Sequence, residues 1–210
     1  MTIETVAGAA ALITGAYLLG SIPTGALVAR ARGVNLRAIG SGNIGATNVG
    51  RALGKRWAVF VLALDAAKGF LPVFLGQRLL TGAAATNRAP AFAAEVAVAA
   101  AGLAAIVGHM FTLFLRGRGG KGVATSLGVS LAISPLAGLC GFLLYGVVYA
   151  LFRVSSLGSL LGVSSFPLFA IALGGVAPAY LALSAVTTTL VIARHRGNIA
   201  RLLRGEEKRW

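Results

Sequence analysis

The chain has 210 residues, of which 57% are hydrophobic and only 11% are charged. An ordinary soluble domain has about 25% charged residues, and a soluble fold this apolar would have too few polar side chains to cover its surface. The single cysteine, Cys140, excludes a disulfide framework within the chain and a zinc site built from cysteines. The composition therefore predicts an integral membrane protein.

Five long apolar runs follow one another along the chain. Crossing the hydrocarbon core takes about 20 helical residues, and each of the first three runs fits one span. The fourth run contains Ser134-Pro135, where proline disfavours helical geometry in the residue before it, and the fifth contains the break GGVAP at 174–178. We therefore expect an all-α, polytopic protein with six or seven spans, one of them short. The runs cover 6–29, 57–76, 91–115, 123–152 and 157–193.

The strong excess of basic residues is explained by their position. With seven spans and the N-terminus outside, almost every Lys and Arg lies in an inside segment; the exceptions are Lys68, within a span, and Arg78 and Arg88 outside. This positive-inside bias predicts about seven transmembrane helices with a cytoplasmic C-terminus, and nucleic acid is not expected as a partner. The first residues, MTIE, carry no positive charge, so the first run is expected to be a retained span. The inside segments are 30–56, 115–122, 153–156 and 194–210.

Two glycine-rich loops lie on the predicted inside, and each has the spacing G-x-G-x-x-G before a segment that can begin a helix. Glycine lets a ligand approach the backbone closely, and N–H groups at a helix start form a nest for anions. Arg51 beside the first loop, and Arg116, Arg118 and Lys121 in the second, add positive charge, which suits a phosphate best. The motif glycines are Gly40, Gly42 and Gly45 in the first loop and Gly117, Gly119 and Gly122 in the second.

Nucleotide-binding loops of soluble proteins share part of this glycine spacing. Asp65 follows Gly45 at the spacing of a dinucleotide-binding fingerprint, but that fingerprint needs a strand–turn–helix unit, and Asp65 lies in an apolar run of membrane length. A Walker-type phosphate loop would need glycine at Leu115, and Ser or Thr in place of Gly122. Glycines that only ease helix packing or tight turns remain the alternative.

Four polar residues near the predicted inner surface require a structural or functional explanation. Asp65 and Lys68 lie three apart within the second span, and we expect them to form a structural ion pair. His109 is either a helix-contact histidine or part of the site. His195 belongs either to a basic membrane-surface segment or to an anion pocket in which it could orient or deprotonate a substrate hydroxyl. No histidine is followed by an acid five residues on, so the common His-x4-Asp acyltransferase motif is absent.

Five segments, in this order, resemble the PlsY family of bacterial membrane acyl-phosphate:glycerol-3-phosphate acyltransferases: GSIPTGALVARARGV (20–34), GSGNIGATNVGRALG (40–54), LDAAKG (64–69), GHMFTLFLRGRGGKGVATSLG (108–128) and HRGNIARLLRGEE (195–207). The resemblance implies a seven-helix topology, and we expect a single membrane-embedded domain over residues 1–210. It further implies transfer of an acyl chain from acyl phosphate to the 1-hydroxyl of glycerol 3-phosphate, giving lysophosphatidic acid and phosphate in phospholipid biosynthesis.

The resemblance also implies site residues. Ser41 and Arg51 match essential positions, Lys121 belongs to a glycerol-3-phosphate-binding loop, and His195 and Asn198 match an essential polar pair. Glu206 matches an acidic residue of mainly structural role, while Gly197 stands where many members have glutamate. The expected catalytic residues are thus Ser41, Arg51, Lys121, His195 and Asn198, and the expected substrate-binding or phosphate-binding residues are Gly40, Gly42, Asn43, Gly117, Gly119, Gly120, Gly122 and Ser156.

We expect direct acyl transfer without an acyl-enzyme, with the acyl chain entering sideways between spans and with neither metal nor cofactor. The expected partners are the two substrates, the lipid bilayer and, functionally, the enzyme that produces acyl phosphate; the expected state is a monomer in the bacterial inner membrane with its active site facing the cytoplasm. One alternative is an anion or organophosphate transporter, which would need binding groups near the midplane and usually repeated halves. Another is a non-catalytic lipid-binding scaffold, whose loop residues would be individually dispensable.

Overall fold

The computed structural model describes residues 3–85 and 90–209. Over these two ranges the chain forms helices joined by turns and loops, and no strand occurs within them. The helices are α1 (Ile3–Ser21), α2 (Thr24–Ala31), the 3-10 turn η1 (Leu36–Ala38), α3 (Ala46–Leu53), α4 (Lys55–Ala85), α5 (Ala91–Met110), the 3-10 turn η2 (Leu113–Leu115), α6 (Val123–Ile133), α7 (Pro135–Phe152), α8 (Ser155–Leu173), α9 (Pro178–Arg194) and α10 (Arg196–Leu203).

The helical content and its apolar character confirm the predicted all-α, polytopic membrane fold. Helices α6 and α9 are apolar but shorter than an ordinary span. At 11 residues, α6 is about 16 Å long, roughly half of the ~30 Å hydrocarbon core, which agrees with the expectation of one short segment. Five segments are long and apolar enough to cross a membrane: Ile3–Ala31, Lys55–Leu80, Ala91–Leu115, Pro135–Phe152 and Ser155–Leu173.

Proline and glycine set the helix boundaries. Both predicted breaks are confirmed: Ser134 ends α6 just before Pro135 begins α7, and Gly174 ends α8 ahead of Pro178, the first residue of α9. The first apolar run differs from the expected single helix, because the chain leaves helical geometry between α1 and α2. Pro23 stands at this break, where it lacks the N–H that a continuous helix would need.

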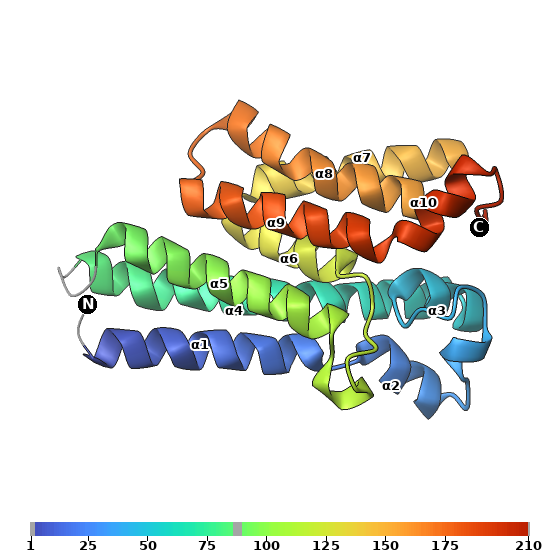
Figure 1. Ribbon diagram of the computed structural model, residues 1–210, viewed down its shortest axis with the longest axis horizontal. Helices are drawn as coiled ribbons and strands as arrows, with labels where there is room; N and C mark the ends of the chain where they lie inside the picture. The colour runs from blue at the N-terminus through green and yellow to red at the C-terminus, as the bar shows by residue number, and fades with distance from the viewer. Residues whose placement is uncertain (1–2, 86–89, 210) are drawn as a thin grey trace.

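The helices pack as two groups connected by α6 (Figure 1). Helices α1, α4 and α5 contact one another on one side, α7, α8 and α9 pack in sequence on the other, and α6 contacts both α4 and α7. The main core lies where α5 meets α4, α6 and α9, around the buried side chains of Val73, Ile106, Val129 and Leu183. The N-terminus lies at one end of the bundle, and the short helices α2, α3 and α10 gather with the C-terminus at the opposite end (Figure 1).

The predicted ion pair inside α4 is confirmed. Lys68 Nζ lies 2.8 Å from Asp65 Oδ1, and both side chains are buried. Lys68 also donates to the carbonyl of Ile22 at 2.8 Å, and the Thr24 hydroxyl donates to Asp65. Paired charges cost less inside a membrane than single ones. The pair therefore binds α4 to the break between α1 and α2.

Candidate functional site

A cavity of about 580 Å³ opens at the end of the bundle where α3 and α10 lie. Its polar end is formed by loop residues and helix starts, and an apolar arm continues from there between α4, α6, α7 and α8. Side chains from distant parts of the sequence therefore share one space. The polar end is lined by Ser41, Asn43, Thr47, Asn48, Arg51, Lys121, Ser155, Ser156, His195, Asn198 and Glu207.

The first glycine loop is held in shape by Asn48, a buried residue of α3. Its side-chain nitrogen donates to the carbonyls of Leu36, Ile39 and Asn43 at 3.2, 3.0 and 2.8 Å, and its oxygen accepts the N–H of Ser41 at 3.1 Å. Because one amide side chain satisfies four backbone groups, the loop has a fixed form before any ligand arrives. The predicted helix start after this loop is confirmed at α3.

The second glycine loop packs directly against the end of α5. Its Gly120 N–H donates to the His109 carbonyl at 3.0 Å, and a Cβ at Gly120 would lie only 2.1 Å from His109 Nε2, so a larger residue would displace the His109 ring. Gly122 adopts a left-handed backbone with φ of 82° and precedes α6, again as predicted. Arg194 holds the loop from the other side by donating to the carbonyl of Gly120 at 2.9 Å.

Arg37 joins the two loops. Its guanidinium donates to the carbonyl of Gly42 in the first loop at 3.0 Å and to the carbonyl of Arg118 in the second. At the chain's other end, Lys208 donates to the carbonyl of Gly40 at 3.1 Å. Segments separated by most of the sequence are thereby fixed around one polar space.

A chain of hydrogen bonds crosses the polar end from Lys121 to Glu207. Lys121 donates to Asn198 Oδ1 at 2.5 Å, and Asn198 donates to Glu207 Oε1 at 2.5 Å. The Ser156 hydroxyl reaches the same oxygen at 2.8 Å, while Arg201 bonds to Glu207 Oε2 at 2.6 Å. The chain connects the second loop, the start of α8, and α10.

The surroundings shift the proton affinities of these groups. Burial, together with the charges of Arg201, Arg51 and Arg194, lowers the pKa of Lys121 to about 8, although Glu207 acts in the opposite direction. Burial would raise the pKa of Glu207, but hydrogen bonds from Asn198, Ser156 and Arg201 outweigh it and hold that pKa below its ordinary value. At neutral pH the site therefore contains a charged ammonium and an ionised carboxylate.

His195 is buried at the junction of α9 and α10. Burial and the nearby charge of Lys121 lower its pKa to about 4, so the imidazole is neutral at pH 7. Its Nδ1 lies 2.8 Å from the carbonyl of Val191. Since a carbonyl only accepts, Nδ1 carries the proton, and Nε2 keeps the free lone pair that a proton acceptor needs.

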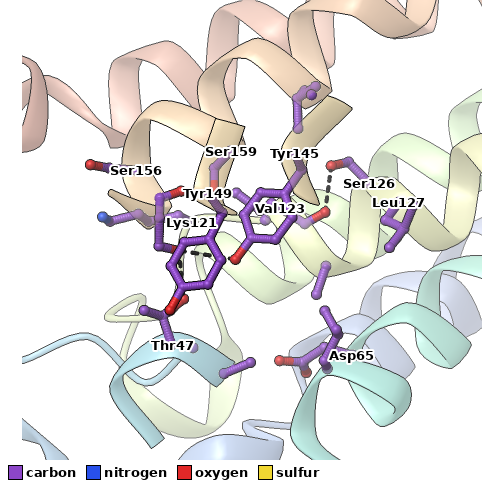
Figure 2. A pocket seen from close by; sticks show the side chains of 18 of the residues that line it. Thr47, Asp65, Lys121, Val123, Ser126, Leu127, Tyr145, Tyr149, Ser156 and Ser159 are labelled. Carbon is purple, nitrogen blue, oxygen red and sulfur yellow. Dashed lines mark hydrogen bonds between the residues drawn. The ribbon is translucent and has the colours of Figure 1, made fainter. Parts of the chain in front are cut away.

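The apolar arm begins beside two tyrosines of α7. The rings of Tyr145 and Tyr149 are stacked, with centroids 6.0 Å apart, and Figure 2 shows both rings inside the cavity, with Thr47, Lys121 and Ser156 on one side and Leu127 on the other. The Tyr145 hydroxyl lies 3.2 Å from Ser155 Oγ, which also bonds to Thr47. The tyrosines thus have polar tips toward the loops and apolar faces toward the arm.

The structure brings together most of the residues predicted from the sequence: Ser41, Asn43, Arg51, Lys121, Gly122, Ser156, His195 and Asn198 all line the one cavity. Arg116 and Arg118, which we expected to add charge to the anion site, are exposed and lie outside its lining. Five predicted glycines shape the loops behind the lining, and their direct part in binding stays a prediction. They are Gly40, Gly42, Gly117, Gly119 and Gly120.

Sequence reasoning assigned the acidic residue of the last motif to Glu206 and did not single out Glu207. Glu206 pairs with Arg204 on the exposed surface, whereas Glu207 lines the cavity, so Glu207 is the acidic residue of this motif that lies in the site. Two adjacent glutamates cannot be told apart by spacing. Asn48 was also missed; its signal was a single asparagine at the buried side of a helix that follows a glycine loop.

His109, which the sequence left open, lines the cavity, and its Nδ1 lies 3.7 Å from Asp65 Oδ1. Over the residues that the structure describes, no group of three or more His, Cys, Asp or Glu side chains could hold a metal ion.

A family profile, related proteins and solved structures all match this chain over nearly its whole length. A family profile described as glycerol-3-phosphate acyltransferase matches residues 10–205. A protein of that name from Anaeromyxobacter sp. (strain Fw109-5) is 49% identical and covers 94% of each chain; one from Myxococcus xanthus is 47% identical, over 95% of this chain and 98% of its own. The crystal structure of PlsY in its glycerol 3-phosphate form aligns with a TM-score of 0.85 and 41% identity over 97% of this chain and 96% of that one. The lysophosphatidic acid form gives 0.83 and 40%, over 97% and 95%.

Proposed function

Since the chain belongs to the PlsY family of glycerol-3-phosphate acyltransferases, we propose that it transfers an acyl chain from acyl phosphate to the 1-hydroxyl of glycerol 3-phosphate. The products are lysophosphatidic acid and inorganic phosphate, and the reaction belongs to phospholipid biosynthesis. The observation that carries this proposal is one cavity with a polar, cationic end and a long apolar arm, which matches one water-soluble phosphate ester and one lipid-like donor.

The polar end supports binding of the phosphate groups of both substrates. Arg51 and Lys121 line it from two different loops, and the starts of α3 and α6 direct backbone N–H groups toward it. Two phosphates repel each other, and fixed cations between them offset that repulsion. Holding both substrates in one orientation supplies the remaining part of the rate enhancement.

The chemistry proceeds in one displacement. The glycerol hydroxyl oxygen attacks the acyl carbonyl carbon, the bond from that carbon to the phosphate oxygen breaks, and inorganic phosphate leaves. The neutral imidazole of His195 receives the hydroxyl proton at Nε2 and returns it to the leaving phosphate. Because bound phosphates bring negative charge next to His195, its pKa in the complex rises from its low value in the free protein, which makes it a better base.

The apolar arm would hold the acyl chain, and its open side supports entry of the donor from the bilayer. Val59 of α4 and Phe142 of α7 both line the cavity and are exposed at the molecular surface. A chain lying between these helices passes from the lipid to the site without crossing water. The donor therefore reaches the site sideways, while glycerol 3-phosphate arrives from the aqueous end.

The remaining proposals concern the cellular setting. The positive charge of the loops supports a polar end at the cytoplasmic face of the bacterial inner membrane, with the N-terminus outside and seven crossings. We propose that residues 1–210 act as a single domain and as a monomer, in which one chain supplies every polar group of the proposed mechanism. An enzyme that makes acyl phosphate supplies the donor.

The test is phosphate release from purified protein in detergent or lipidic mesophase supplied with palmitoyl phosphate. Release that depends on glycerol 3-phosphate, and that is lost in Ser41→Ala and His195→Ala, is the expected result. If folded protein released no phosphate, the acyltransferase proposal would be rejected, and uptake of phosphate esters into liposomes would test the transporter alternative.

A further inference from the structure

The apolar arm ends at the same depth on three helices. On α8 the lining residues follow one another at helical spacing from Ser156 to Phe166, and on α6 the last one is Ser130. Helix α7 runs antiparallel to α8, since only two residues join them, and its deepest lining residue is Gly138. From Ser156 to Phe166, at 1.5 Å per residue, the arm is about 15 Å long.

This length is that of one leaflet, because the hydrocarbon core of a bilayer is about 30 Å thick. Two of the serines along the arm, Ser126 and Ser159, each donate their hydroxyl to a carbonyl of their own helix. Side chains bonded in this way present little unsatisfied polarity to the cavity. A fatty acyl chain of membrane length fits such a space.

A second, small cavity of about 10 Å³ lies beside the inner part of the arm and reaches past its end, since its lining on α6 runs from Ser126 to Ile133. Four residues line both cavities and form the partition between them: Ser126, Ser130, Val163 and Phe166. Phe166 is the bulkiest of the four and is buried; it packs against Ala137 and Ala170. The far side of the partition is lined by Ile106, Tyr180 and Thr187 of α5 and α9.

We propose that Phe166, supported by Val163, is the stop that sets the longest acyl chain the protein accepts. This inference depends on the proposed acyltransferase function, because it assigns the arm to the acyl chain of the donor. A chain longer than the arm meets the Phe166 ring, and its carboxyl end is then held short of the reacting position. Removing the ring joins the two cavities and lengthens the arm.

The experiment compares lauroyl, palmitoyl and arachidoyl phosphate as donors for the wild type, Phe166→Ala and Val163→Phe. Phe166→Ala is expected to raise the arachidoyl to palmitoyl ratio of kcat/KM by about tenfold or more, the discrimination that one added or missing methylene gives in an apolar pocket. Val163→Phe fills the arm and is expected to lower the palmitoyl to lauroyl ratio by a similar factor. Leu168→Ala is the matched control, because Leu168 lies on α8 but is exposed and outside the cavity.

The outcomes separate this inference from the proposed function. Glycerol-3-phosphate-dependent turnover with unchanged chain-length ratios in both variants would overturn the role of Phe166 and leave the acyltransferase intact. Absence of turnover with every donor, in the wild type as well, would remove both proposals. KM for glycerol 3-phosphate is expected to stay at the wild-type value, since the partition lies at the opposite end of the arm; a large change would contradict a local role in chain length.

Discussion

Lys121 gives the site a charge that depends on pH near neutrality. Its pKa of about 8 means that it is protonated, and able to hold a phosphate, below that pH and neutral above it. We therefore expect kcat/KM for glycerol 3-phosphate, which reports the free protein, to fall about tenfold for each pH unit above about 8. Steady-state phosphate release with palmitoyl phosphate kept well below its KM measures this, because the protein then stays mostly free of substrate. In Lys121→Arg the alkaline fall should be absent, because arginine stays charged; an unchanged fall would assign it to another group.

His195 sets the limit of activity at acidic pH. With a pKa of about 4, it becomes protonated only in acid, and protonation occupies the lone pair that receives the substrate proton. We expect kcat/KM to fall as the pH decreases through about 4, and His195→Gln to lower it at every pH. Retention of near wild-type turnover by His195→Gln would show instead that a substrate phosphate oxygen takes the proton.

Glu207 and Glu206 form a matched pair for testing the hydrogen-bond chain. Glu207→Gln removes the charge that raises the pKa of Lys121, so the alkaline limit should move to lower pH. Loss of its charged hydrogen bonds should also reduce the free energy of unfolding by about 1–3 kcal/mol. Glu206→Gln, whose partner Arg204 is exposed, should change neither by a measurable amount. Thermal unfolding in detergent and the pH profile of kcat/KM report the two effects. Equal behaviour of the two variants would refute the assignment of Glu207 to the hydrogen-bond chain.

At the scale of elements, α7 and α8 approach through glycine. A Cβ at Gly141 would lie 2.8 Å from the carbonyl oxygen of Gly162, so the two backbones are in contact beside the apolar arm. We expect Gly141→Ala to push the helices apart and to lower the free energy of unfolding by about 1–3 kcal/mol. Gly146→Ala on the same helix, where a Cβ meets nothing within 4 Å, should instead be neutral or stabilising by about 0.5–1 kcal/mol. A similar loss of thermal stability in both would contradict this packing.

Two helix breaks were the feature of the elements that local sequence predicted best, whereas α4 extends to Ala85, past the expected end at 76, and α5 ends at Met110, before the expected 115. Ser134-Pro135 and the GGVAP segment end helices because proline and glycine act on the backbone within one or two residues, whatever lies around them. The break between α1 and α2 follows the same rule at Pro23 but was not predicted, since the apolar run continues across it. The apolar character of a segment predicts that it lies within the membrane, whereas the continuity of a helix depends on its backbone N–H groups.

At the scale of the whole molecule, the orientation in the membrane is open to direct test. The N-terminus and C-terminus lie at opposite ends of the bundle (Figure 1), as an odd number of crossings requires. In a Cys140→Ala background, we expect Glu4→Cys to react with a membrane-impermeant maleimide from outside intact spheroplasts and Arg209→Cys to react only after lysis. Both native residues are exposed. If Arg209→Cys reacted from outside and Glu4→Cys only after lysis, the topology would be the inverse of the one proposed, with the basic loops outside.

Local sequence was enough to establish the membrane class, the helix breaks at Ser134-Pro135 and GGVAP, and the two glycine loops, because these follow from composition and from residues next to one another. It also predicted the Asp65–Lys68 pair, since residues three apart share a helical face. Tertiary packing was needed to show which glutamate joins Asn198, that Asn48 shapes the first loop, and that Phe166 closes the apolar arm. These depend on contacts between segments far apart in the chain, and no periodicity in the sequence specifies which side chains meet once the helices have packed.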